Sequence, residues 1–154
     1  MEYTSLDTIP YYADCAPIVK AAGYVLVELR VFRTNGTIQI RAVIGHADSS
    51  VKTGIGIDDC AKVHRVLLPR MEAILDSQDT YMEVTSPGTE RNIKNAAEFP
   101  FFKEKYIRVY DVSVSDWVSG QIVDADENQL KLKIDDAERS IPLEQISKAK
   151  LLNS

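Results

Sequence analysis

The chain has 154 residues, of which 45% are apolar and 27% are charged, and its net charge is −5. This length suits one medium domain or two small ones. The acidic balance argues against a protein that works mainly through clustered lysines and arginines on phosphates, and no apolar run approaches the roughly 20 residues that a membrane-spanning helix needs.

The first part of the chain predicts a helix followed by a hairpin. Apolar residues recur at three- and four-residue spacing over residues 9–22, which predicts a helix that is kinked or restarted at Pro17. Over residues 25–32 the period changes to two, which is typical of a strand. Asn35-Gly36 predicts a tight two-residue turn, and residues 38–44 alternate as the partner strand.

A second helix and a third strand complete this part. The helix is expected to begin at Asp58 or Asp59, either of which can cap it. Its apolar stripe consists of Cys60, Val63, Leu67, Met71 and Ile74. Residues 81–85 read as a short strand. We therefore predict that residues 1–94 form a small α/β domain, a three-stranded sheet packed with two helices.

From residue 95 onward the pattern predicts a short helix and then only strands. The helix is expected over residues 95–102. Five short strands are expected near residues 106–113, 116–124, 128–134, 137–141 and 147–152. Residues 141–146 predict one helical turn before the last strand. Short strands at such spacing favour a small barrel over residues 95–154.

One pair of residues is a candidate for chemistry. Cys60 and His64 stand four residues apart, as on one helix face, and a thiol beside an imidazole can be a nucleophile or half of a metal site. Cys60 also belongs to the apolar stripe, where a free cysteine packs as a small apolar residue. The packing interpretation is preferred, and we expect no catalytic residue, no metal site and no cofactor.

Surface charge suggests two candidate contact regions. Residues 111–138 contain eight acidic and two basic residues, which suits a basic protein partner, although a solvated face that keeps the protein soluble has the same composition. Four basic residues are candidates for a subunit or RNA contact: Arg30, Arg41, Arg91 and Lys94. Arg30 and Arg41 alternate with apolar residues, so we expect them to point away from the helices. Scattered surface charge is the alternative.

Several segments together resemble the RimP family of bacterial ribosome maturation factors. The most specific is Val84–Arg91, which resembles the family's strand-end segment around Ser-Pro-Gly. Ala22–Glu28 resembles the entry into its first strand, and Ile57–Val63 resembles the start of its helix. In the second half, Ser119–Ile122 and Ile141–Ala149 are similar to its barrel pattern. The resemblance runs from Pro17 nearly to the C-terminus.

The resemblance implies an α+β protein: an N-terminal α/β domain (residues 1–94) followed by a C-terminal SH3-like (Sm-like) barrel with a short leading helix (residues 95–154). It implies a non-catalytic factor that binds the immature small (30S) ribosomal subunit and assists its assembly. The expected partners are ribosomal RNA and a ribosomal protein near the decoding region. A cytoplasmic monomer without membrane attachment is predicted.

Candidate contacts follow from this resemblance. An acidic barrel suits a strongly basic ribosomal protein, and the residues proposed for that contact are Asp124, Asp126, Asp135 and Asp136. The signature turn consists of Ser86, Pro87, Gly88 and Arg91. It is interpreted either as a rigid lock between the domains or as a direct ribosome contact. The alternative function is a small-barrel RNA-binding module that acts outside ribosome assembly.

Overall fold

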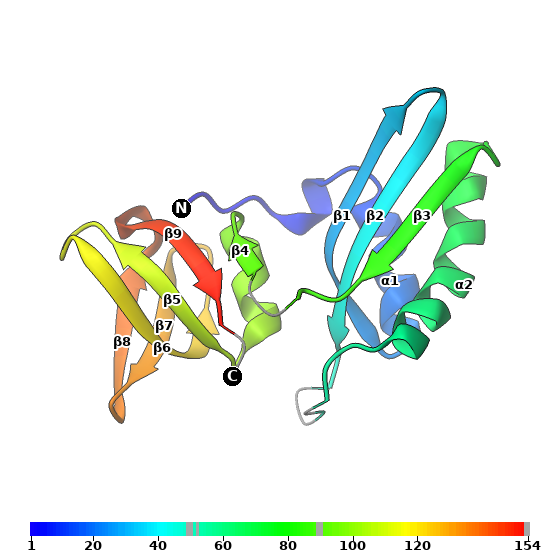
Figure 1. The fold of residues 1–154 in the computed structure, drawn as a ribbon. Helices are drawn as coiled ribbons and strands as arrows, with labels where there is room; N and C mark the ends of the chain where they lie inside the picture. Colours follow the sequence, from blue (N-terminus) through cyan, green and yellow to red (C-terminus); the bar gives the residue numbers. More distant parts are fainter. Residues whose placement is uncertain (49–50, 52, 89–90, 153–154) are drawn as a thin grey trace. The chain divides into compact units, whose positions relative to one another are not determined.

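The structure, a computed structural model, describes residues 1–48, 51, 53–88 and 91–152. The chain forms two compact units (Figure 1). The first unit is Leu6–Pro87, and the second unit combines Gly88–Ser154 with Met1–Ser5. By contacts, the division thus falls after Pro87, whereas the sequence analysis placed it after residue 94. The extent of the independently folding domains stays a prediction.

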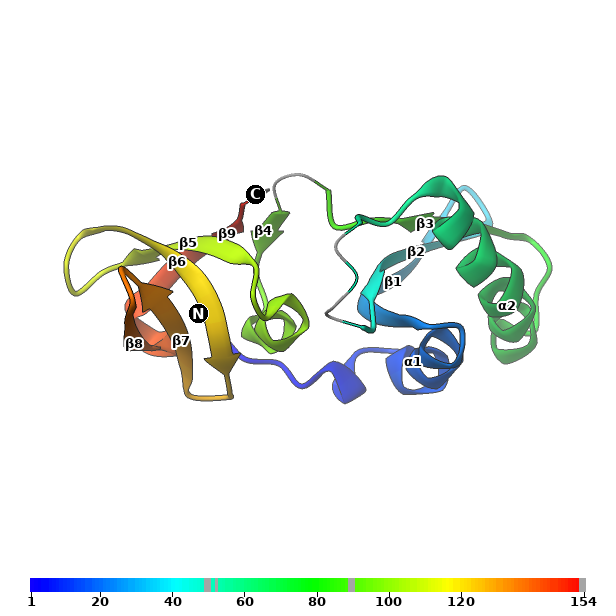
Figure 2. The ribbon, with the colours of Figure 1, turned by 90° about the horizontal axis from the view of Figure 1, so that it is seen from below.

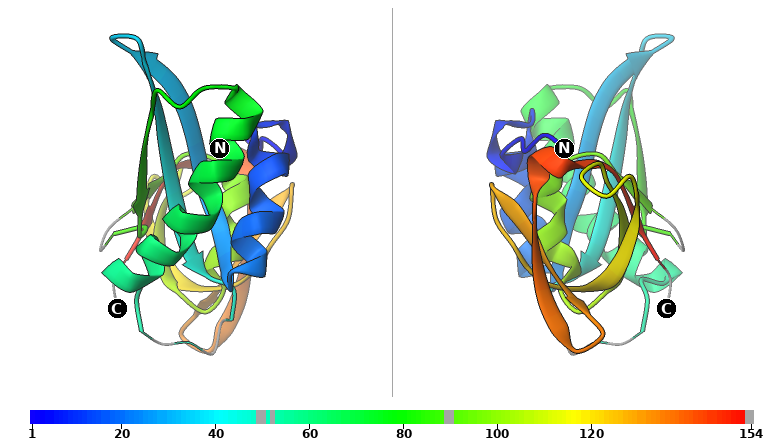
Figure 3. Two further views of the ribbon diagram at one scale, coloured as in Figure 1. Left: turned by 90° about the vertical axis from the view of Figure 1, so that its right-hand side faces the viewer. Right: turned by 90° about the vertical axis from the view of Figure 1, so that its left-hand side faces the viewer.

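The first unit is a three-stranded sheet with both helices on one face. Its elements are η1 (Leu6–Thr8), α1 (Tyr12–Ala21), β1 (Tyr24–Thr34), β2 (Thr37–His46), α2 (Ile57–Leu75) and β3 (Thr80–Thr85). The strand order is β1-β2-β3. β1 and β2 are antiparallel, whereas β2 and β3 are parallel because α2 forms the crossover between them. Figure 2 and the left-hand panel of Figure 3 show α1 and α2 side by side on the same face of the sheet.

The hairpin and the first helix test two local predictions. Asn35 has φ 50° and Gly36 has φ 82°, with Thr34 paired to Thr37, so the predicted tight turn is confirmed. The prediction that the first helix restarts at Pro17 is wrong, since α1 is one helix through this proline. Proline removes one helical hydrogen bond, and tertiary packing of the buried residues of α1 supplies the stabilisation that propensity alone does not.

A β-bulge decides which side chains of β1 reach the core. Pairing with β2 shifts between Leu26 and Glu28, so Val27 is an extra residue in β1. Strict alternation would put Leu26 and Leu29 on opposite faces of the sheet. The bulge changes the phase, and both side chains belong to the core against the helices.

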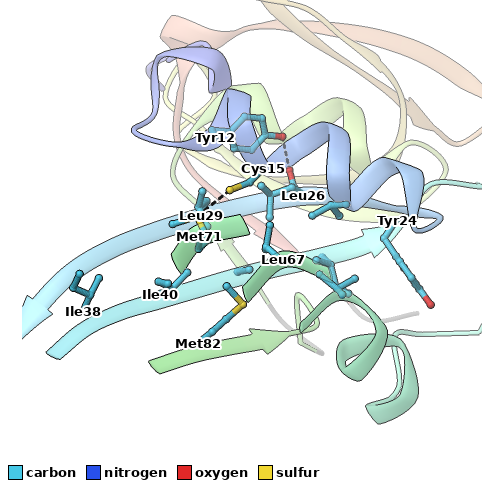
Figure 4. Close-up of a cluster of buried hydrophobic side chains, with 14 residues drawn as sticks. Tyr12, Cys15, Tyr24, Leu26, Leu29, Ile38, Ile40, Leu67, Met71 and Met82 are labelled. Atoms are coloured by element: carbon cyan, nitrogen blue, oxygen red, sulfur yellow. Dashed lines mark hydrogen bonds between the residues drawn. The ribbon is translucent and has the colours of Figure 1, made fainter. Parts of the chain in front are cut away.

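The core of the first unit confirms the predicted stripe of the second helix (Figure 4). Val63, Leu67 and Met71 of α2 are fully buried, whereas Cys60 is only half-buried. From α1, the Tyr12 hydroxyl donates to the Leu26 carbonyl oxygen at 2.5 Å, so a buried phenol has its polar end satisfied.

The second unit is built around an antiparallel sheet. Its elements are β4 (Arg91–Ile93), η2 (Ala96–Phe102), β5 (Tyr106–Asp111), β6 (Asp116–Ala125), β7 (Gln129–Ile134), β8 (Ala137–Pro142), η3 (Leu143–Gln145) and β9 (Ile146–Leu151). β5 to β9 correspond to the five predicted strands, and η2 and η3 correspond to the predicted helical segments, both as 3-10 helices. β4 was not predicted.

The pairing of these strands leaves the sheet open. The order is β4-β9-β5-β6-β7-β8, so among the described residues β4 and β8 are edge strands. The α+β class therefore stands, but the closed barrel expected from the sequence is not confirmed. Closure depends on pairing between strands distant in the chain, which strand spacing does not specify.

Gly120 explains one of the motifs quoted above. A Cβ atom at this position would lie 2.9 Å from the Lys133 carbonyl oxygen and 2.9 Å from Ile134 Cγ1. β6 and β7 therefore approach each other so closely that only glycine fits without a backbone shift.

The N-terminal residues are attached to the second unit. The side chain of Asn95 accepts from the Thr4 N–H and donates to the Thr4 carbonyl oxygen, both at 2.9 Å. The Ala96 N–H donates to the Glu2 carbonyl oxygen at 3.0 Å. Within the described part of the chain, no helix has the length and apolar character that crossing a bilayer requires.

Candidate functional site

The face of the first sheet that α1 and α2 leave uncovered carries two of the predicted basic residues. Arg30 and Arg41 are direct partners in the β1–β2 register. Their guanidinium carbons lie 5.5 and 5.4 Å from the centre of the Phe32 ring. Arg41 also lies 3.7 Å from Glu83 on β3, and both side chains are exposed. The prediction that these arginines point away from the helices is consistent with this geometry.

The other two basic candidates belong to the second unit and differ from each other. Lys94 is exposed, just after β4. Arg91 is largely buried, and its Nε donates to Glu98 Oε1 at 2.8 Å, with 13% and 8% of the two side chains exposed. Arg30 and Arg41 thus belong to the first unit, and Arg91 and Lys94 belong to the second. Their contact with a subunit or RNA stays a prediction.

The signature turn ends β3 and stands at the division between the two units. Gly88 has φ 84°, which favours glycine because other residues rarely adopt this conformation. Ser86 and Pro87 precede it outside the strand. Arg91 follows in β4 and contributes its guanidinium to the ion pair with Glu98 of η2. The Arg91–Glu98 ion pair lies within the second unit. The choice between a lock between the domains and a ribosome contact stays a prediction, and residues 89–90 lie outside the described residues.

The four acidic candidates form two separate pairs. Asp124 lies near the end of β6, 3.3 Å from Lys103 Nζ, and Asp126 Oδ1 accepts from the Asn128 and Gln129 N–H groups in the β6–β7 loop. Asp135 and Asp136 form the β7–β8 turn with φ 50° and 65°.

Strand β7 separates Asp126 from Asp135 by roughly 20 Å, given the rise of a strand, whereas Asp124 is paired with Lys131 in the middle of β7. Their joint contact with one ribosomal protein stays a prediction, and the two ends of β7 are tested separately below.

The helix start that includes Cys60 is organised by Asp59. Asp59 Oδ2 accepts from the Gly56 N–H at 2.8 Å, and Asp59 Oδ1 accepts from the Tyr24 hydroxyl at 2.5 Å. Of the two acids predicted to cap the helix, Asp59 thus bonds the backbone at its first turn. The Tyr24 ring in turn lies 5.7 Å from the His46 ring.

Cys60 lacks the environment of a reactive thiol. Burial, followed by the nearby Asp59 carboxylate, raises the pKa of the Cys60 thiol, which disfavours the thiolate that a nucleophile or metal ligand requires. Among the described residues, no three His, Cys, Asp or Glu side chains gather as a metal site would need.

The Asp59 contacts predict an acid-sensitive stabilisation of the helix start. The Gly56 N–H, followed by the Tyr24 hydroxyl, lowers the pKa of Asp59 below its ordinary value of 3.8. The folded state then binds fewer protons than the unfolded state, so this stabilisation is complete above pH 3.8 and is lost as the pH falls through the lowered pKa. Tyr24→Phe is expected to raise the Asp59 pKa, measured by NMR titration of its carboxylate. An unchanged pKa would contradict the role assigned to the hydroxyl.

Comparison with known proteins agrees with the family resemblance found in the sequence. Residues 14–90 match the family model described as the RimP N-terminal domain. The chain belongs to the RimP family. A relative named "Ribosome maturation factor RimP", from Borrelia hermsii (strain HS1 / DAH), is 28% identical over 146 residues, which cover 95% of this chain and 96% of that protein.

Segments that resemble RimP contribute residues to structural contacts within the units. Tyr24, in the first-strand segment, donates to Asp59, in the helix-start segment. Arg91, in the most specific segment, pairs with Glu98. The first contact lies within the first unit and the second lies within the second unit, so these motif residues have structural roles and do not by themselves mark a surface for a partner.

Sequence reasoning missed one group of side chains. Arg108, Lys148 and Lys150 belong to the second unit, whose composition suggested an acidic surface. They lie on β5 and β9, which pair directly although they are far apart in the chain. A charge count along a contiguous segment does not detect such a group, whereas the strand register does.

Proposed function

We propose that this chain is a ribosome maturation factor that binds the immature small ribosomal subunit and assists its assembly without catalysing a reaction. The observation that carries the proposal is the match of residues 14–90 to the RimP N-terminal domain, together with a relative named a ribosome maturation factor that aligns along nearly the whole chain. We also propose that the protein acts in the cytoplasm as a monomer, without a cofactor or membrane attachment.

The second unit is proposed to be a variant of the SH3-like (Sm-like) barrel. Support comes from the five consecutive strands β5 to β9 and from the helical turn η3 before the last of them. In this proposal, a ribosomal protein near the decoding region contacts the acidic ends of β7. The contact suits a basic partner, because complementary charge accelerates association and gives a complex that salt weakens.

The first unit is proposed to contribute a contact to ribosomal RNA. Arg30 and Arg41 lie next to each other on the uncovered sheet face, with Phe32 between them. Arginine binds phosphates through a planar fork of donors and stacks on aromatic rings. Both properties suit an RNA backbone lying across this face.

Co-sedimentation tests the proposed function. Purified protein is expected to bind free small subunits in preference to complete ribosomes. Asp124→Asn/Asp126→Asn and Asp135→Asn/Asp136→Asn test the two acidic ends separately. Asparagine tolerates positive φ, so the β7–β8 turn is retained. The variant at the docking end is expected to weaken binding about tenfold at low salt, mainly through a slower association rate.

The control carries the same change of charge elsewhere. Asp7→Asn/Asp14→Asn replaces two exposed acids of the first unit, and its subunit binding is expected to match that of the unmodified protein. Equal binding by all three variants would contradict the acidic contact. Equal sedimentation with free subunits and complete ribosomes would contradict the proposed function itself.

A further inference from the structure

Charge is segregated within the second unit. Most of its acidic residues lie on β6, on β8 and in the loops at the two ends of β7. Four cations of this unit are paired with acids: Lys103 with Asp124, Lys131 with Glu138, Lys133 with Asp136 and Arg139 with Asp111 of β5. A second group of cations lies on or beside strands β4, β9 and β5.

Strand register places these cations on one face together with aromatic rings. Tyr110 of β5 pairs with Lys148 on one side and Trp117 on the other, and Arg108 pairs with Lys150. Side chains at directly paired positions share a face of the sheet. The alternating residues of β5, Ile107 and Val109, are fully buried on the opposite face. We call the set Lys94, Arg108, Tyr110, Trp117, Lys148 and Lys150 the cationic face.

The cationic face is hollowed. A cavity of about 660 Å³ is lined by Lys94, Trp117, Lys148 and Lys150, with Asn92 and Glu2 beside them. Every lining residue belongs to the second unit. Glu2 is the single carboxylate among the lining residues, against three lysines, so the cavity has a positive electrostatic character that favours an anion.

Trp117 and Arg108 form the centre of this face. The Arg108 guanidinium carbon lies 4.7 Å from the centre of the Trp117 ring, and Tyr110 meets that ring edge-on at 5.6 Å. Trp117 nevertheless keeps 38% of its surface exposed. The buried Nε of Arg108 has no hydrogen-bond partner, and buried polar atoms are usually paired.

The cations of this face also differ in their pairing from the lysines that lie near the acidic residues. Among the described residues, neither Lys94 nor Lys148 forms an ion pair, and neither does Arg108. Three cations without carboxylate partners, beside an exposed aromatic ring and a hollow, make a surface that complements a ligand with both negative charge and flat rings.

We propose that the cationic face binds a short stretch of single-stranded RNA. One base lies against Trp117 and the Arg108 guanidinium, and the neighbouring phosphates lie on Lys94 and Lys148. Unpaired bases stack on aromatic rings and guanidinium planes, while lysines neutralise the backbone. An acidic protein segment would satisfy the lysines but would leave the ring platform unused. This site goes beyond the proposed function, because it is a further contact, separate from the ends of β7 that are proposed to contact a protein.

The single tryptophan of the chain gives a direct test. Adding a 12-nucleotide oligoadenylate at low salt is expected to quench Trp117 fluorescence as a base stacks on its ring. In parallel, anisotropy of the labelled RNA measures affinity. Trp117→Ala is expected to weaken binding about tenfold, within the range for one stacked base. Lys94→Gln/Lys148→Gln is expected to reduce the slope of log affinity against log salt by about 1.4, which corresponds to two phosphate contacts on a single strand.

The matched control is Lys103→Gln/Lys131→Gln, which removes the same charge from the acidic side of the same unit. It is expected to change RNA affinity less than twofold. Equal weakening by both lysine pairs would overturn the proposal, as would undetectable binding of the oligoadenylate. Polyglutamate, an anion without flat rings, is the second probe. If polyglutamate at equal charge displaces the RNA, and the RNA does not quench Trp117 fluorescence, the proposal is also overturned.

The outcome is separable from that of the proposed function. Co-sedimentation that persists without RNA binding contradicts only the cationic face. RNA binding without co-sedimentation contradicts only the subunit proposal and favours the small RNA-binding module that acts outside ribosome assembly.

Discussion

Glu98→Leu is expected to lower the free energy of unfolding of the second unit by about 3 kcal/mol, because it removes the Glu98 carboxylate from the charged, largely buried Arg91 guanidinium. The two side chains are 13% and 8% exposed and are joined at 2.8 Å. Leucine has a volume close to that of glutamate, so the loss reports the charge and not a cavity. Denaturant titration followed by Trp117 emission measures the change in this unit.

The double variant Arg91→Met/Glu98→Leu distinguishes the cost of removing one partner from the contribution of the ion pair itself. Replacing both partners with apolar residues is expected to restore most of the lost stability, since a buried pair is often replaced at little cost while a single buried charge is not tolerated. Lys131→Met breaks an exposed pair at 3.8 Å and is expected to cost less than about 1 kcal/mol. A double variant as unstable as Glu98→Leu would contradict this account of the pair.

This result bears on the most specific family segment. Sequence reasoning recognised residues 84–91 from their pattern and left open a lock or a ribosome contact. The structure shows the Arg91 side chain turned into the unit. Its partner Glu98 was not predicted, because seven residues and a change from strand to 3-10 helix separate them, and no periodicity connects the two positions.

Local patterns predicted most of the elements and few of the sites. The tight turn at Asn35-Gly36 and the buried stripe of α2 depend on neighbours in the chain, so their residue types were sufficient. The phase of β1 depends on a bulge at Val27, for which the sequence carries no separate signal.

Candidate sites were harder to predict because they depend on strand register. Arg30 and Arg41 were found because one tight hairpin fixes their pairing. Arg108 and Lys150 lie far apart in the chain and are brought opposite each other only by the pairing of β5 with β9. Conversely, Asp126 and Asp135 look like neighbours in the sequence, but they lie at opposite ends of β7.

Leu67→Ala is the change expected to affect the first unit most. Leu67 is fully buried, with 0% of its surface exposed to solvent. It lies on α2 within the core cluster that joins both helices to the sheet. Removing its branched end loses apolar burial and leaves a cavity, so the free energy of unfolding is expected to fall by about 3 to 4 kcal/mol. Denaturant titration followed by circular dichroism at 222 nm measures it, because both α-helices belong to this unit.

Val66→Ala is the matched control, since Val66 precedes Leu67 on the same helix and is 43% exposed. Its effect is expected to stay within about 0.5 kcal/mol. Measured together, Leu67→Ala and Glu98→Leu also test whether the two units of the chain fold independently. If the two units fold independently, Leu67→Ala shifts the helical transition and leaves the Trp117 transition in place, whereas Glu98→Leu does the reverse. A common shift of both transitions in either variant would show that the units unfold as one, because each substitution perturbs contacts of a single unit.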